Sequence, residues 1–155
     1  MLTLSKSRHI IGAAIQRARK LDANISVAVC DGHGRLIALN RMDGAVDWDV
    51  DRCSMGKAVA AAIIGCPSDQ LSEQLRTDGP RLSSCNVVPP RGQRGGLPII
   101  EEGVVQGGCG VSGAPTAEQD EECARAGIDA LHAVKMEPDL AGYADRSSLS
   151  MASSA

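Results

Sequence analysis

The sequence predicts an α+β fold, in which a predominantly antiparallel sheet is flanked by helices. Two pairs of short segments carry apolar residues with a period near two, and a tight turn joins the members of each pair. Segments with apolar residues at spacings of three and four stand before, between and after these pairs, which is the helical pattern. A chain of 155 residues suits one compact domain. The predicted order is helix, two strands, two helices, two strands and helix.

The first helix is predicted from an apolar stripe, while Arg17, Arg19 and Lys20 fall elsewhere on the helical wheel. The stripe consists of Ile11, Ala14, Ile15, Ala18 and Leu21. The residues Asp22–Asn24 then end the helix.

A hairpin is predicted over Ile25–Gly44, and it ends with Arg41 and Asp43 close together. Its two strands surround the sequence Asp-Gly-His-Gly at residues 31–34, which supplies the positive φ angles that a tight turn needs. The second helix is predicted to start at Asp47 as its N-cap and to continue through Ile63, and Gly65–Pro67 ends it.

Ser68 is predicted to cap a short helix that runs to about Leu75. The next twenty residues, Thr77–Gly96, are rich in Pro, Gly, Ser and Arg. A segment of this length without regular structure is more often functional or mobile than idle in a compact domain.

The second strand pair is predicted over Leu97–Glu101 and Val104–Val111. Its second strand carries the adjacent glycines Gly107 and Gly108, where a ligand or another backbone segment can approach closely. The last helix is predicted to start after Thr116, the first residue of a capping box. Its buried stripe consists of Ala124, Ile128, Leu131 and Val134.

Composition excludes several classes of partner. The net charge of −3 comes from 16 basic and 19 acidic residues that are mixed along the chain, which argues against nucleic acid as a partner. No apolar run approaches the length needed to cross a membrane, and the first twenty residues lack a secretion signal. We therefore expect a cytoplasmic protein.

The six cysteines form no C-x-x-C pair, and no His stands near them at a metal-ligand spacing. We expect reduced, mostly structural thiols and no metal site.

The chain has no Phe, one Trp, one Tyr and 17 glycines. Surfaces built from such small residues favour burial between copies of the chain, so we expect a homo-oligomer.

Four segments together resemble the GlcG/HbpS-like haem-degrading family, which includes the C-terminal domain of PduO-type corrinoid proteins. They are the residues 41–45 (Arg-Met-Asp-Gly-Ala), 57–58 (Lys-Ala), 95–99 (Gly-Gly-Leu-Pro-Ile) and 107–113 (Gly-Gly-Cys-Gly-Val-Ser-Gly). The resemblance covers roughly Ser5 to Val134. It implies a profilin-like or PAS-like sandwich with one domain over residues 1–136, and an oligomer that is a dimer or a higher assembly such as an octamer. The residues 137–155 are too polar and small to pack reliably, so we expect a loose tail there.

The resemblance implies a protein that binds haem or another tetrapyrrole and that has a haem-degrading activity. Haem commonly needs an axial side-chain ligand, for which His9 and His132 are the candidates. Lys57 is predicted to meet the propionates together with the loop that carries Arg94. The adjacent glycines Gly95, Gly96, Gly107 and Gly108 complete the predicted ligand-binding set.

A second interpretation is a cofactor-free catabolic enzyme, an isomerase, deaminase or hydrolase that acts on a small unsaturated carboxylic acid. Arg41 and Arg94 would bind carboxylates, because a guanidinium presents two donors to two oxygens. Lys57 would stabilise an enolate or oxyanion. Either Glu101 or Asp43 would move the proton. The alternative for Arg41 and Asp43 is that they pair with each other or brace the turn.

Both interpretations need a cationic cleft, lined by small side chains, where the second helix meets the glycine-bearing strands. An anionic small molecule would bind there, next to Lys57. A third interpretation is an oligomeric scaffold without chemistry. It predicts that Lys57 is dry and fully paired inside the protein.

Overall fold

The protein contains one four-stranded sheet with the strand order β2-β1-β4-β3, in which every neighbouring pair is antiparallel. The computed structural model describes residues 1–45, 49–74, 76 and 91–133. The strands are β1 (Ser26–Asp31), β2 (Leu36–Arg41), β3 (Gly96–Glu101) and β4 (Val104–Ser112). This confirms the predicted α+β class and both predicted strand pairs. The predicted tail and residues 77–90 of the long segment lie outside the described residues, so the boundary at residue 136 stays a prediction.

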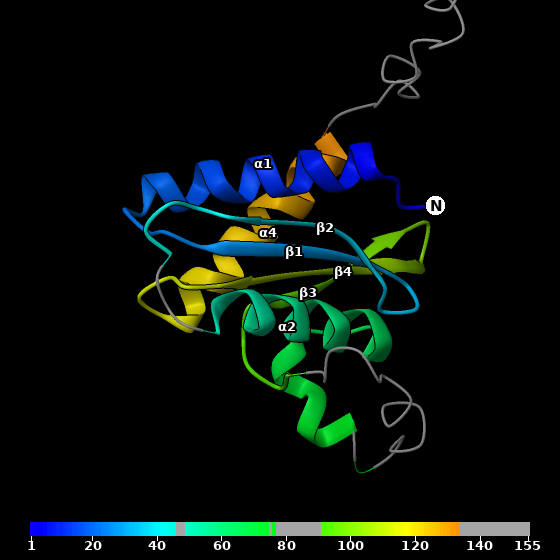
Figure 1. Ribbon diagram of the computed structural model, residues 1–155. Helices are drawn as coiled ribbons and strands as arrows, with labels where there is room; N and C mark the ends of the chain where they lie inside the picture. Colours follow the sequence, from blue (N-terminus) through cyan, green and yellow to red (C-terminus); the bar gives the residue numbers. More distant parts are fainter. Residues whose placement is uncertain (46–48, 75, 77–90, 134–155) are drawn as a thin grey trace, which may run out of the picture.

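Helices cover both faces of the sheet (Figure 1). The helices α1 (Leu4–Lys20) and α4 (Ala117–Ala133) pack together on one face, and α2 (Val50–Ile64) lies on the other. The short 3-10 helix η1 (Ser68–Gln70) follows α2, and residues 71–74 continue as an α-helix. Within the described ranges, no helix is both long and apolar enough to span a bilayer.

The core is built from aliphatic, alanine and cysteine side chains, as expected from the composition. Beneath α1 and α4, the fully buried side chains include Ile10, Ile25, Val27, Ile99 and Val111. On the α2 face, a smaller cluster of buried residues consists of Ala28, Cys30, Met55, Ala58, Val59 and Ala62. Because β1 is buried on both faces, it lies at the centre of the fold.

The structure sets the starts of two helices. The first helix, which the sequence predicted from its apolar stripe alone, begins at Leu4, because the side chain of Thr3 accepts a hydrogen bond from the Lys6 backbone N–H and caps it. Asp47 lies outside the described residues. The structure starts α2 at Val50, after Asp49, whose side chain makes no capping bond.

Candidate functional site

Lys57 lies inside the protein and is paired. Its side chain is 4% exposed, and its Nζ atom donates hydrogen bonds to the carbonyl oxygen of Val111 and to Oδ2 of Asp120, each at 2.9 Å. The other carboxylate oxygen of Asp120 accepts a hydrogen bond from the Ala114 backbone N–H at 3.0 Å. This buried ion pair joins α2 to the end of β4 and to the start of α4, which is the arrangement that the scaffold interpretation predicted for Lys57.

The predicted cleft between α2 and the glycine-bearing strands is wrong, because the helix backbone fills that space. A Cβ atom at Gly108 would overlap the carbonyl oxygen of Ala58, and one at Gly110 would overlap that of Ser54. The other glycines of the predicted binding set are also enclosed. A Cβ atom at Gly107 would overlap the Cys30 carbonyl oxygen, one at Gly96 would overlap the Lys57 carbonyl oxygen, and one at Gly95 would lie 2.8 Å from the Val111 carbonyl oxygen. Gly96, Gly108 and Gly110 allow α2 to pack closely on the sheet, and none of these glycines leaves room for a ligand there.

The structure separates two residues of the enzyme interpretation, Arg41 and Glu101. Arg41 ends β2 and pairs with Ser26 at the start of β1, so it lies at the same end of the sheet as the start of β3. Glu101 ends β3 and lies at the opposite end. The structure therefore does not assemble a site in which Arg41 holds a substrate while Glu101 moves its proton.

The two predicted carboxylate-binding arginines have partners within the protein. The Arg41 guanidinium lies 3.9 Å from Asp51, not from Asp43, which is exposed in the turn after β2. Arg94 donates to Glu121 at 2.9 Å and to Glu118 at 3.4 Å, and its side chain is 43% exposed. Both arginines form surface ion pairs, which contribute little to stability.

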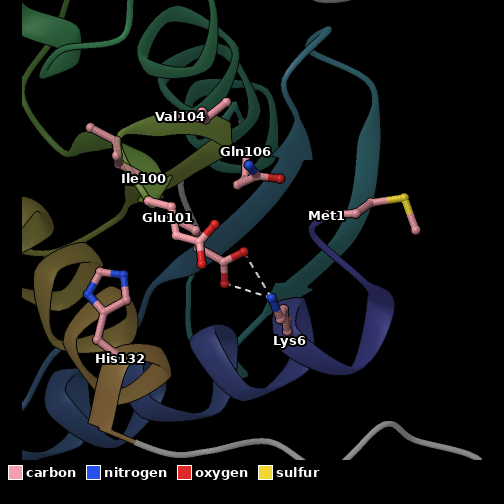
Figure 2. A pocket seen from close by; sticks show the side chains of 8 residues that line it. Met1, Lys6, Ile100, Glu101, Val104, Gln106 and His132 are labelled. Carbon is pink, nitrogen blue, oxygen red and sulfur yellow. Dashed lines mark hydrogen bonds and ion pairs between the residues drawn. The ribbon is translucent and has the colours of Figure 1, made fainter.

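A pocket with a volume of about 610 Å³ lies between the start of α1, the end of α4 and the β3–β4 turn. Its volume is in the usual range for small-molecule sites, roughly 300–1,000 Å³. Figure 2 shows His132 of α4 on one side, Lys6 of α1 on the other, and Glu101 between them. The lining residues are Met1, Lys6, Ile100, Glu101, Glu102, Val104, Gln106 and His132.

The two predicted haem ligands, His9 and His132, differ in exposure and in their hydrogen-bond partners. The ring nitrogen Nε2 of His9 lies 3.2 Å from the carbonyl oxygen of Ala130, and the residue is half-buried between α1 and α4. His132 is exposed and lines the pocket. The side chains of Ile100 and Val104, 39% and 58% exposed, add apolar surface to the same pocket. Of the two histidines, His132 is the one that lines the pocket.

Sequence reasoning missed Asp120 and Lys6. Asp120 stands four residues before Ala124 and eight before Ile128, so its spacing already placed a carboxylate on the buried stripe of α4. Lys6 carries no comparable signal. Its partner Glu101 is 95 residues away in the sequence, and only the folded chain brings the two together.

The buried thiols of Cys109 and Cys123 have raised pKa values and low reactivity. Burial first, and then the neighbouring thiols of Cys30 and Cys123, raise the pKa of Cys109 to about 12. Burial, with the carboxylates of Asp120 and Glu122, raises the pKa of Cys123 to about 11. Since the thiolate is the nucleophile, both groups stay protonated and unreactive near neutral pH. In the part of the chain that the structure describes, no three His, Cys, Asp or Glu side chains gather to hold a metal ion.

We therefore expect iodoacetamide at pH 8 to alkylate the half-buried Cys53 and Cys66 in the folded protein, while Cys109 and Cys123 stay unmodified. Peptide mass spectrometry after timed quenching measures each site. The same reaction in 6 M guanidinium chloride is the control, in which all four thiols should react. Alkylation of Cys109 in the folded protein as fast as Cys53 would contradict its burial.

Comparisons with known proteins agree on one family. The family model described as "Haem degrading protein HbpS-like" matches residues 2–129. Protein GlcG of Escherichia coli is 31% identical over 112 residues, which cover 72% of this chain and 81% of GlcG. An uncharacterised 15.0 kDa protein from the dhaT-dhaS intergenic region of Citrobacter freundii is 29% identical over 133 residues, which cover 83% of this chain and 90% of that protein.

Solved structures give the same result. A double mutant of HbpS from Streptomyces reticuli has a TM-score of 0.72 and 32% identity, over 83% of this chain and 85% of that one. The crystal structure of a PduOC–haem complex has a TM-score of 0.70 and 26% identity, over 83% of this chain and 94% of that one. The predicted resemblance is confirmed.

Proposed function

Because the chain belongs to the family of HbpS-like haem-degrading proteins, we propose that it binds haem in the pocket between α1, α4 and the β3–β4 turn. The observation that carries the location is the exposed imidazole of His132 at the wall of a pocket of about 610 Å³. A related protein has been crystallised in complex with haem, which supports the choice of ligand.

The residues of the pocket fit such a group. His132 supplies an imidazole, a common axial ligand of haem iron. Ile100 and Val104 supply exposed apolar surface for a porphyrin edge, and Lys6 supplies a cation for a propionate. When bound, haem would bring redox chemistry that the side chains lack. The chain's own residues would bind it and orient it.

His132→Ala is expected to weaken haemin binding at least about tenfold, because even the hydrogen-bond partners of a metal ligand contribute that much. Titration with haemin, followed at the Soret band, measures the affinity. His9→Ala should keep the band, because the His9 ring is already engaged with the Ala130 carbonyl.

The matched control is His33→Ala, which removes an exposed histidine at the β1–β2 turn. It should bind haemin like the unmodified protein. If His132→Ala binds equally well and His9→Ala does not, the axial ligand is His9 and the pocket is misassigned. A chain that gives no Soret band at all with haemin contradicts the proposed function.

Degradation of the bound haem is a further part of the proposal, and its support is the family description. The test is whether the Soret band decays and iron is released when a reductant and oxygen are supplied.

The expectations of a cytoplasmic location and of a homo-oligomer stay predictions. The catabolic enzyme is not favoured, because the family description and the PduOC–haem complex both support haem as the ligand.

A further inference from the structure

The pocket contains an internal ion pair beside its histidine. The Nζ atom of Lys6 donates hydrogen bonds to both carboxylate oxygens of Glu101, at 2.6 Å and 2.9 Å. Both side chains are 25% exposed. In Figure 2 the pair spans the pocket from α1 to the end of β3, with the ammonium group directed at the carboxylate. A ligand that enters the pocket therefore meets this pair.

The acidic side chains around the pocket oppose the binding of an anionic ligand. Lys6 is the one lysine or arginine among the eight lining residues, whereas Glu101 and Glu102 are both acidic. Two of the three ammonium protons of Lys6 are already directed at Glu101, which leaves one for a second acceptor. A ligand carboxylate that binds Lys6 must share it with Glu101 or replace Glu101 as its partner.

We propose that Lys6 is the residue that binds the carboxylate of a ligand in this pocket, and that Glu101 competes with the ligand for it. The inference rests on the proposed function, since it concerns the same pocket. Glu101 then lowers affinity for anionic ligands and discriminates in favour of those whose carboxylate reaches Lys6. This assigns Glu101 a role in ligand selection, in place of the proton transfer expected from the sequence.

The test compares haemin with haemin dimethyl ester, in which both propionates are neutral, by Soret titration. Glu101→Gln removes the competing charge and should lower the dissociation constant for haemin about fivefold, the equivalent of a part-exposed ion pair. Lys6→Met should raise it about fivefold. The dimethyl ester should respond less than twofold to either change, because it brings no carboxylate.

Glu122→Gln is the matched control. Glu122 pairs with Arg17 between α4 and α1, so the variant removes one carboxylate from a similar ion pair outside the pocket. Its affinity for haemin should equal that of the unmodified protein. Circular dichroism of each variant, recorded before titration, shows that it is folded.

The outcomes separate the inference from the proposed function. If Glu101→Gln and Glu122→Gln bind haemin equally, or if the dimethyl ester responds as haemin does, the role of Lys6 is wrong while haem binding stands. If the unmodified protein gives no Soret band with haemin, both fail. A Lys6→Met variant that is folded and binds haemin unchanged also overturns the inference.

Discussion

Gly110→Ala is expected to lower the free energy of unfolding by about 3 kcal/mol or more, at the upper end of what overpacking costs. The added Cβ would overlap the carbonyl oxygen of Ser54 and lie 2.5 Å from the backbone nitrogen of Ala58. Both atoms belong to the backbone of α2, so no change of side-chain rotamer relieves the overlap. The helix must move away from β4, and the contacts of the α2 face are lost.

Gly12→Ala is the matched control, because it is the same substitution at an exposed position within α1, with nothing within 4 Å of the added Cβ. It should stabilise the protein by about 0.5–1 kcal/mol through helix propensity. Urea denaturation of both variants measures the difference. Equal midpoints would show that α2 does not pack against β4 as closely as described.

Lys57→Met is expected to cost about 3–5 kcal/mol of unfolding free energy, because it leaves the Asp120 carboxylate buried without its cation. The Asp120 side chain is 8% exposed, so water does not compensate for the lost partner. Urea denaturation measures the loss. The variant separates a structural role from a ligand-binding one, because its folded fraction should still bind haemin with unchanged affinity.

The double variant Lys57→Met with Asp120→Asn removes both charges and keeps an oxygen that can accept the hydrogen bond from Ala114. It should recover most of the lost stability, since a buried pair replaced as a unit is often nearly neutral. Arg94→Met, which breaks an exposed ion-pair cluster, is the control and should cost less than about 1 kcal/mol. Additive losses in the double variant would contradict the pairing of Lys57 with Asp120.

The fold was predictable because its signals are local. Apolar periodicity and turn glycines specified both strand pairs, and the stop at Gly65 coincides with a C-cap residue in the left-handed conformation. One helix start was misplaced, since α2 begins at Val50 after Asp49 and not after the predicted N-cap Asp47. The position of a helix end depends on single capping hydrogen bonds, such as the one from the Lys6 backbone N–H to the Thr3 side chain. The spacing of apolar residues does not indicate such bonds.

The candidate site was predictable only in part. His132 and Glu101 were chosen for their chemistry, and both line the pocket. Lys57 was correctly identified as unusual within an apolar helix, but the choice between a ligand and Asp120 as its partner depends on how α2 and α4 meet the sheet. Sequence spacing carries no such information across separate elements.

The strand order has a consequence for how the chain acquires its structure. The two central strands, β1 and β4, belong to different hairpins, and their register joins Ser26 to Ser112. Isolated hairpins are marginally stable in water, so neither hairpin is stable until β1 pairs with β4. Pairing β1 with β4 closes a long loop, which costs conformational entropy. This cost arises before the burial of apolar side chains compensates for it. Since β1 precedes β4 in the chain, we expect the sheet to form cooperatively only once β4 is available to pair with β1.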